Sequence, residues 1–303
     1  MDYKDKYIKY KTKYLELKNI DTNNQIGGGK NKLLFIMFPG NGVIKNGWDT
    51  IDFNYKTGAI KRNNFIKEIK KLGEIYFYEP KYYNIYHYNG NEGYDKWYSK
   101  DINFTKDDID IDKICENIYN DVKDFNGKIV LLGHSMGSYF VYYFSQKYAS
   151  KCLFGIIIDG MLFFSPPNLT NKKKYTKYTD KDIDELRKEI PNGNKKSINE
   201  LYNVYFNNIV SYEKIIKNFK TFKTPIISFC NFEIIIDKTK KEDINYYNKA
   251  NRERINENNY MRKYNKSSKF IDFVNKTHFP HLVEESKDII LENIKLMITK
   301  YNK

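Results

Sequence analysis

The chain has 303 residues, of which 41% are hydrophobic and 30% charged, so it can bury a sizeable core and is not disordered as a whole. No stretch approaches 18 consecutive apolar residues, which argues against a membrane-spanning helix, and the N-terminus lacks the apolar core of a signal peptide. We therefore expect a cytoplasmic protein, although the formal net charge of +14 calls for an explanation.

The positive charge consists almost entirely of Lys, since only five of the 52 basic residues are Arg. Proteins that read nucleic acids favour Arg, whose planar guanidinium binds phosphate and guanine in a bidentate way. The chain is also rich in Asn, Ile, Tyr and Phe, residues whose codons are A/T-rich. We interpret the charge mainly as a result of composition and expect no nucleic-acid partner, while an electrostatic role remains the alternative.

The first 20 residues are predicted to form an amphipathic helix. Aromatic and apolar residues recur there at spacings of four and three, at Tyr3, Tyr7, Tyr10, Tyr14 and Leu17. Three glycines at 27–29 predict a flexible linker, so we divide the chain into residues 1–29 and 30–303. An isolated helix of this length is marginal in water, so the segment either docks on another surface or is an unstructured tail.

The Lys- and Tyr-rich opening and the overall composition resemble proteins of giant DNA viruses. This resemblance implies a viral protein, located in the host cytoplasm or in the virion. It also implies that residues 1–20 attach the protein peripherally to a membrane or to a virion component.

From residue 31 onward, apolar strands alternate with helices, which predicts a mostly parallel sheet covered by helices on both faces. The strands are expected at 33–38, 74–78, 128–132, 153–158, 225–232 and 270–274. The helices are expected at 63–72, 108–125, 136–148, about 241–264 and 283–301.

Two long segments interrupt this alternation. Residues 81–107 are rich in Tyr, Asn and Gly and are predicted to form a surface excursion. Residues 162–222 are too long for a simple crossover between strands and contain predicted helices at about 180–189 and 197–218. We predict that this second segment is a helical cap inserted over one end of the sheet.

The main chemical motif is Gly133-His134-Ser135-Met136-Gly137, a G-x-S-x-G sequence between a predicted strand and a predicted helix. A tight turn at this point needs small residues on both sides of the serine and exposes the serine oxygen at the carboxyl end of the strand. The N-terminus of the following helix favours negative charge that develops there. Ser135 is therefore the predicted nucleophile.

A serine hydroxyl needs a base, and the chain has four histidines. His87 lies in the irregular excursion, and His134 adjoins the serine, where its ring cannot easily reach the serine oxygen. His278 and His281 both follow the last predicted strand. We favour His278 as the base and expect His281 to pack at the start of the final helix. A metal site formed by these two histidines lacks a convincing third ligand, so no metal is expected.

The base in turn needs a carboxylate, and the developing oxyanion needs backbone donors. Glu233 directly follows a late strand and is the favoured acid, with Asp237 as the first alternative and Asp159 as the second. One oxyanion donor is expected to be the N–H group of Met136. The other is expected in the Gly-rich loop at 39–42, at Asn41.

Together these motifs resemble the α/β-hydrolase superfamily over residues 31–303. The resemblance rests on the serine turn, the 39–42 loop, Glu233 after its strand, the sequence Thr277–Leu282 and the chain order serine, acid, histidine. Many members have His-Gly where this chain has Pro39-Gly40-Asn41, which instead resembles the loop of lipid-droplet-associated serine hydrolases.

The resemblance implies an α/β-hydrolase fold and a serine hydrolase that cleaves a small-molecule or lipid ester through an acyl-enzyme on Ser135. Lipase, esterase and thioesterase activities are all compatible with it, and no cofactor is required. The alternative is a non-catalytic protein of the same fold that serves in binding or as a virion component.

Overall fold

The computed structural model describes residues 31–40, 48, 50–51, 61–79, 110–160, 223–232, 265–274 and 280–303, with isolated positions between 181 and 188 and between 252 and 263. The chain divides into two compact units, Met1–Asn31 with Lys303, and Lys32–Asn302. Only the second unit is described below. The expected N-terminal helix at 1–20 and the expected excursion at 81–107 lie outside the described residues.

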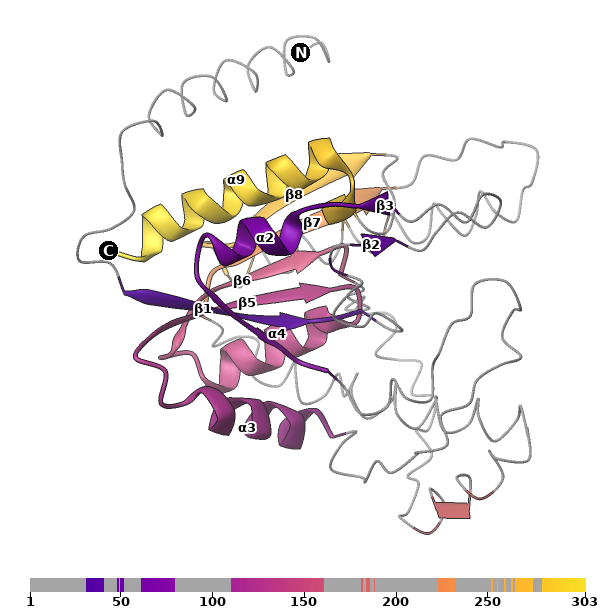
Figure 1. Cartoon of the computed structure of the whole chain (residues 1–303), viewed down its shortest axis with the longest axis vertical. Helices are drawn as coiled ribbons and strands as arrows, with labels where there is room; N and C mark the ends of the chain where they lie inside the picture. The colour runs from indigo at the N-terminus through magenta and orange to yellow at the C-terminus, as the bar shows by residue number, and fades with distance from the viewer. Residues whose placement is uncertain are drawn as a thin grey trace. The chain divides into compact units, whose positions relative to one another are not determined.

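The second unit is built on a six-stranded sheet in which all neighbouring strands are parallel (Figure 1). The spatial order of the strands is β4 (Glu74–Phe77), β1 (Lys32–Phe38), β5 (Gly127–His134), β6 (Cys152–Ile158), β7 (Ile226–Phe232) and β8 (Lys269–Val274). All six predicted strands are confirmed. A short antiparallel pair, β2 (Thr50–Ile51) with β3 (Lys61–Arg62), was not predicted.

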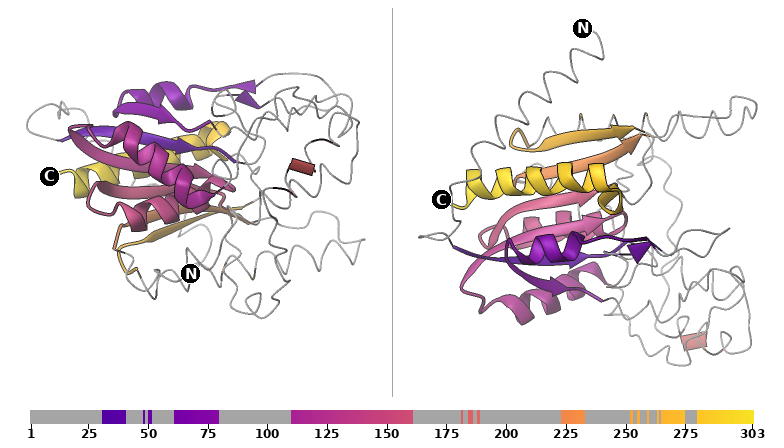
Figure 2. Two further views of the ribbon diagram at one scale, coloured as in Figure 1. Left: turned by 90° about the horizontal axis from the view of Figure 1, so that it is seen from below. Right: turned by 45° about the horizontal axis from the view of Figure 1, so that its top comes forward.

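Helices cover both faces of the sheet, as predicted (Figures 1 and 2). Helices α2 (Phe65–Lys70) and α9 (Glu284–Tyr301) lie on one face, while α3 (Ile111–Val122) and α4 (Gly137–Lys147) lie on the other. Helix α3 begins where the Asp110 side chain accepts a hydrogen bond of 2.8 Å from the Asp112 N–H. A parallel sheet in this strand order, with helices on both faces, is an α/β-hydrolase fold.

Strand β1 shows why the sequence of the sheet is continuously apolar, because six of its seven residues are buried. Leu33, Phe35 and Met37 belong to the core that α2 and α9 cover. On the opposite face, Phe38 stacks on Phe140 of α4, with ring centroids 5.3 Å apart. A strand buried on both sides cannot show the alternation of polar and apolar residues that marks a half-exposed strand.

The parallel arrangement brings the carboxyl ends of the strands to one edge of the sheet. Asn41 follows β1, Ser135 follows β5, Glu233 follows β7, and His278 follows β8. Segments far apart in the sequence therefore leave the sheet at the same edge, where binding sites of parallel α/β folds usually lie.

Little of the expected cap is described. Four positions between 181 and 188 are helical, within the helix expected at 180–189. Four positions between 252 and 263 are likewise helical, within the helix expected at 241–264. The rest of residues 162–222 lies outside the described residues.

None of the helices in the described part combines the length and apolar character needed to cross a membrane.

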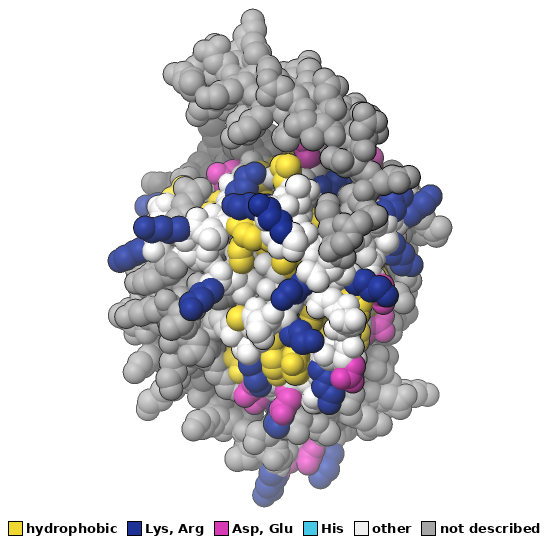
Figure 3. Space-filling view, turned by 90° about the vertical axis from the view of Figure 1, so that its left-hand side faces the viewer, with side chains coloured by type: hydrophobic (Ala, Val, Ile, Leu, Met, Phe, Trp, Pro, Cys, Tyr) yellow, Lys and Arg dark blue, Asp and Glu magenta, His cyan; other side chains and the backbone are white. Residues whose placement is uncertain are grey.

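The basic side chains on one face of the molecule are dispersed (Figure 3). Figure 3 shows one face of the molecule, on which Lys and Arg side chains are spread among hydrophobic, acidic and neutral ones. Several of the lysines pair within their own helix, as Lys71 does with Glu68 at 2.6 Å and Lys113 does with Glu116 at 3.1 Å. Such pairs are typical of a solvated helix surface.

Candidate active site

Ser135 occupies a strained turn between β5 and α4. Its φ is 50°, in the left-handed region that non-glycine residues rarely adopt, which costs about 1–3 kcal/mol. The turn is fixed from both sides: the Ser135 N–H donates to the Ile158 carbonyl at 3.0 Å, and the Ser135 carbonyl accepts from the Ser138 N–H at 3.1 Å and from the Ser138 hydroxyl at 2.7 Å. This is the geometry expected of a nucleophile elbow.

Two glycines allow the backbone to approach this turn closely. A Cβ atom at Gly137 would lie 2.1 Å from the Phe38 carbonyl oxygen, so the first turn of α4 can contact the end of β1 only without a side chain there. A Cβ atom at Gly40 would lie 2.7 Å from Nδ1 of His134 and 3.0 Å from Cβ of Ser135. The segment after β1 is therefore in direct contact with the serine.

The N-terminus of α4 leaves a backbone donor available beside Ser135. Met136 stands at the N-cap position of α4, and its side chain makes no capping hydrogen bond. Within the part of the chain that the structure describes, no carbonyl accepts the Met136 N–H. The orphan donors of a helix N-terminus attract negative charge. The second predicted donor, Asn41, directly follows Gly40 and lies outside the described residues.

The predicted base and the two favoured acids also lie outside the described residues, but the ends of the strands that precede them are described. Phe232, the last residue of β7, pairs with Val274, the last residue of β8. Glu233 therefore follows directly on a strand end beside the start of the segment that carries His278. Asp237 follows four residues later.

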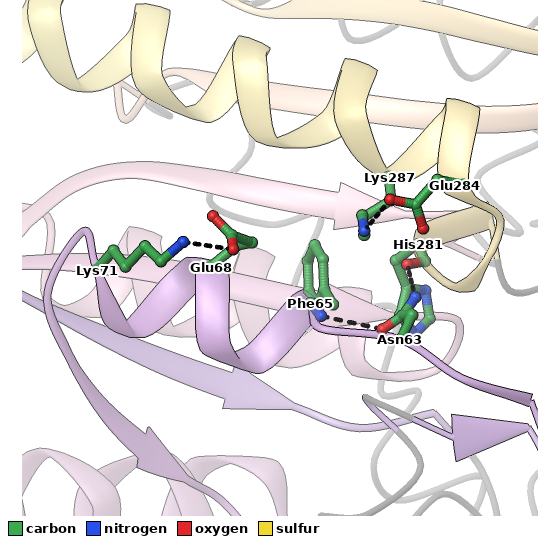
Figure 4. Close-up of polar contacts among 7 residues, drawn as sticks. All are labelled: Asn63, Phe65, Glu68, Lys71, His281, Glu284 and Lys287. Carbon is green, nitrogen blue, oxygen red and sulfur yellow. Dashed lines mark hydrogen bonds and ion pairs between the residues drawn. The ribbon is translucent and has the colours of Figure 1, made fainter.

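His281 lies where it was expected, at the start of the final helix. It belongs to the short 3-10 helix η8 (Pro280–Leu282), which precedes α9, and it is buried. Figure 4 shows the Asn63 side chain, which donates to the His281 carbonyl at 2.7 Å and accepts from the Phe65 N–H at 3.0 Å. His278 precedes this anchored residue by three positions in the sequence.

Asp159, the remaining acid candidate, ends β6 beside the serine turn. Its φ is 42°, it is buried, and its N–H donates to the Phe229 carbonyl at 2.7 Å. Gly160, the next residue, lies against Ser138 of the first turn of α4. The position next to the nucleophile keeps Asp159 open as an alternative to Glu233 and Asp237.

The cysteines do not offer a second nucleophile in this region. Cys115 and Cys230 are buried, Cys152 is half-buried, and none of the three forms a disulfide bond. Burial raises the pKa of the Cys115 and Cys152 thiols, which disfavours the reactive thiolate. Among the described residues, no three His, Cys, Asp or Glu side chains lie together in a way that could hold a metal ion.

Trp48 belongs to no motif in the sequence, yet its ring contacts the rings of two histidines, one of which directly precedes Ser135. The ring centroids of Trp48 and His134 are 6.2 Å apart, and those of Trp48 and His281 are 5.3 Å apart. Trp48 stands in a polar, glycine-containing segment without periodicity, so no local pattern could have predicted its burial.

No protein-family model matches the sequence. No curated protein matches it either. Among solved structures, the chain is similar to the monoacylglycerol lipase of Paleococcus ferrophilus, with 13% identity, a TM-score of 0.48, and coverage of 89% of this chain and 97% of that chain. It is similar to an esterase of Thermogutta terrifontis, with 13% identity, a TM-score of 0.47, and coverage of 91% and 92%.

Human thioesterase 2 is another similar structure, with 11% identity, a TM-score of 0.46, and coverage of 90% of this chain and 98% of that chain. Because these identities and scores are low, the assignment of the fold rests on the strand order and on the serine turn described above.

Proposed function

We propose that this chain is a serine hydrolase that cleaves a carboxylic ester, of the lipase, esterase or thioesterase type, through an acyl-enzyme on Ser135. The observation that carries the proposal is the backbone of Ser135. A serine is held at a φ of 50° between a parallel strand and a helix, with glycine contacts on both sides. This conformation costs free energy that an ordinary turn would not require. The same geometry is what a nucleophile at the carboxyl edge of the sheet requires.

In the proposed reaction, the Ser135 oxygen attacks the ester carbonyl while His278 accepts the hydroxyl proton. The bond from the tetrahedral carbon to the leaving group, C–O in an ester or C–S in a thioester, then breaks, and His278 gives the proton to the leaving alcohol or thiol. Water deprotonated by His278 attacks the acyl-enzyme, which releases the acid and restores Ser135. No cofactor or metal ion takes part in these steps.

The negative charge of each tetrahedral intermediate needs donors that are already in place. The Met136 N–H, at the start of α4, suits this role because no described carbonyl accepts it. Asn41 is proposed as the second donor, and the contact of the preceding Gly40 with Ser135 supports that role. The helix dipole of α4 favours the same charge.

The acid that orients His278 is proposed to be Glu233. It follows β7 directly, and β7 pairs with β8 up to the residue before the His278 segment. Glu233→Gln should therefore lower kcat by about 100-fold or more, while Asp237→Asn and Asp159→Asn should have small effects. If only one of the latter two variants loses turnover, the acid is that residue.

The function is tested by reaction with a fluorophosphonate probe, which phosphonylates activated serines. We expect stoichiometric labelling of the wild type and none of Ser135→Ala. An unlabelled wild type, or equal labelling of both proteins, would contradict the proposal and favour a non-catalytic binding or virion component. A panel of p-nitrophenyl esters and acyl thioesters of increasing chain length would then define the substrate class.

The N-terminal segment is proposed to determine where the protein acts. Its Lys-rich helical pattern suits an anionic surface, such as a membrane or a virion component, in a host cytoplasm. This role is separate from the reaction, because every proposed catalytic residue lies between Asn41 and His278.

A further inference from the structure

A cluster of four buried rings includes His134, the residue before Ser135, and we call it the imidazole–aromatic cluster. Its members are Trp48, Phe65, His134 and His281, each at most 1% exposed. The His134 and His281 rings meet edge to face, with centroids 5.2 Å apart. Trp48 and Phe65 each contact the His281 ring at a centroid distance of 5.3 Å. His281 is therefore enclosed by the other three members.

The four rings come from four different segments of the chain, two of which carry proposed catalytic groups. His134 directly precedes Ser135, and its ring lies against Gly40, the residue before Asn41. His281 follows His278 by three residues. The nucleophile, an oxyanion donor and the base thus all belong to segments that meet at the His134–His281 contact.

The choice of residues in the cluster also calls for an explanation. An imidazole is costlier to bury than a phenyl ring, because its nitrogens lose hydration. Two histidines in contact are therefore an unusual way to fill space beside Trp48 and Phe65. The backbone of His281 is fixed independently, since its carbonyl accepts from the Asn63 side chain at 2.7 Å (Figure 4).

We propose that His281 is a positioning residue that holds the base segment against the nucleophile turn, an inference that rests on the proposed function. Its ring, packed on His134 and Trp48, sets the distance between His278 and the Ser135 oxygen. The ring is buried and does not touch substrate, so its loss should affect the chemical step rather than substrate binding. A displacement of about 1 Å in such a group can cost about 100-fold in rate.

The test compares His281→Ala with His281→Phe and uses Met297→Ala as the matched control. Met297 is a buried residue of α9 in the same core, far along the helix from the site. We expect His281→Ala to lower both kcat and the rate of fluorophosphonate labelling by about 10- to 100-fold with KM changed less than about 2-fold. His281→Phe, which retains a ring, should recover most of the loss, and Met297→Ala should keep the wild-type labelling rate.

A further variant, Asn63→Ala, keeps the inference testable if His281→Ala fails to fold. Asn63→Ala removes the hydrogen bond to the His281 carbonyl without emptying the ring cluster, and should lower kcat by about 3- to 10-fold at unchanged KM. Thermal melts are recorded for each variant, and all rates are measured well below the midpoints.

Each of four outcomes would overturn the positioning role of His281. A labelled wild type together with unimpaired His281→Ala and Asn63→Ala overturns the positioning role and leaves the hydrolase function intact. An equal rate loss in Met297→Ala also overturns it, because the effect would then follow core destabilisation. Raised KM with unchanged kcat would place His281 in substrate binding instead. An unlabelled wild type would overturn the hydrolase function and this inference together.

Discussion

Ser135 and Asp159 have the same unusual backbone conformation at the ends of neighbouring strands. Their φ angles are 50° and 42°, and among the described residues they are the non-glycine positions with positive φ. The Ser135 N–H donates to the carbonyl of Ile158 on β6, and the Asp159 N–H donates to the carbonyl of Phe229 on β7. These hydrogen bonds link the ends of β5, β6 and β7 and fix the backbone conformations of Ser135 and Asp159. The edge of the sheet is therefore rigid at the serine.

Replacing Ser135 by glycine should stabilise the protein while abolishing its activity. Glycine adopts positive φ without steric strain, so Ser135→Gly should raise the free energy of unfolding by about 1 kcal/mol. Urea unfolding measures the change, and fluorophosphonate labelling confirms the loss of the nucleophile. Ser135→Ala is the control, since it removes the hydroxyl but keeps the Cβ atom. Equal stability of the two variants would mean that the conformation is not strained.

The two close-contact glycines should respond differently to alanine. At Gly137 the new methyl group would meet backbone, 2.1 Å from the Phe38 oxygen, so α4 or β1 must move. We expect Gly137→Ala to lose about 3 kcal/mol or more of stability, together with all activity.

At Gly40 the new methyl group would meet side-chain atoms of His134 and Ser135 rather than backbone. Gly40→Ala should therefore fold with a loss of about 1–2 kcal/mol but hydrolyse esters about 10- to 100-fold more slowly. Circular dichroism melts and kcat together separate the two cases. Wild-type turnover in Gly40→Ala would contradict the direct contact between this loop and the nucleophile.

Stability should fall at alkaline pH partly because of Cys115. Burial raises the pKa of its thiol, whereas an unfolded cysteine has a pKa of about 8.5. Above about pH 8.5 the unfolded state therefore binds fewer protons than the folded state, and the free energy of unfolding falls by up to about 1.4 kcal/mol per pH unit for this group. Its contribution is fully present below that pH.

Urea unfolding at pH 7.5 and 9.5 checks this sign. Cys115→Ala should start less stable, because it leaves a small cavity, but should lose about 1 kcal/mol less than the wild type between the two pH values. Parallel pH dependence in the two proteins would show that Cys115 does not titrate with unfolding.

Removing residues 1–29 should leave ester hydrolysis within about 2-fold of the full-length rate, since the segment contributes no proposed catalytic group. Association with anionic vesicles should fall by about 10-fold or more if the Lys-rich helix is the attachment point. Sedimentation with vesicles and kcat/KM are measured on the same preparations. Loss of hydrolysis alone would assign the segment to the catalytic unit.

The sheet could be predicted from the sequence because burial on both faces leaves a clear pattern. Strand β5, for example, combines a continuous apolar run with a glycine-rich end. A helix was expected over 108–125, but α3 spans Ile111–Val122, and the Asp110 side chain caps its start. The two-residue strands β2 and β3 are too short to leave any periodicity.

The site could be predicted only in part, for physical reasons. Ser135 is signalled by local sterics, since a tight turn requires glycines at fixed spacing. The packing of His281 at the start of α9 could also be predicted from its place between the last strand and the last helix. The contact between His281 and Trp48 depends on tertiary packing of segments more than 200 residues apart, which no local pattern encodes.

The position of α9 has a consequence for synthesis on the ribosome. This helix supplies Ile290, Leu291, Ile294, Met297 and Ile298 to the core on one face of the sheet, where α2 contributes only three residues. Until the last turn of α9 has emerged, that apolar face is open to water. Strand β1 also cannot pair with β5 until some 95 further residues have been synthesised. The nascent chain therefore passes through a long stage in which aggregation competes with folding, and chaperone binding has its greatest effect before α9 has emerged.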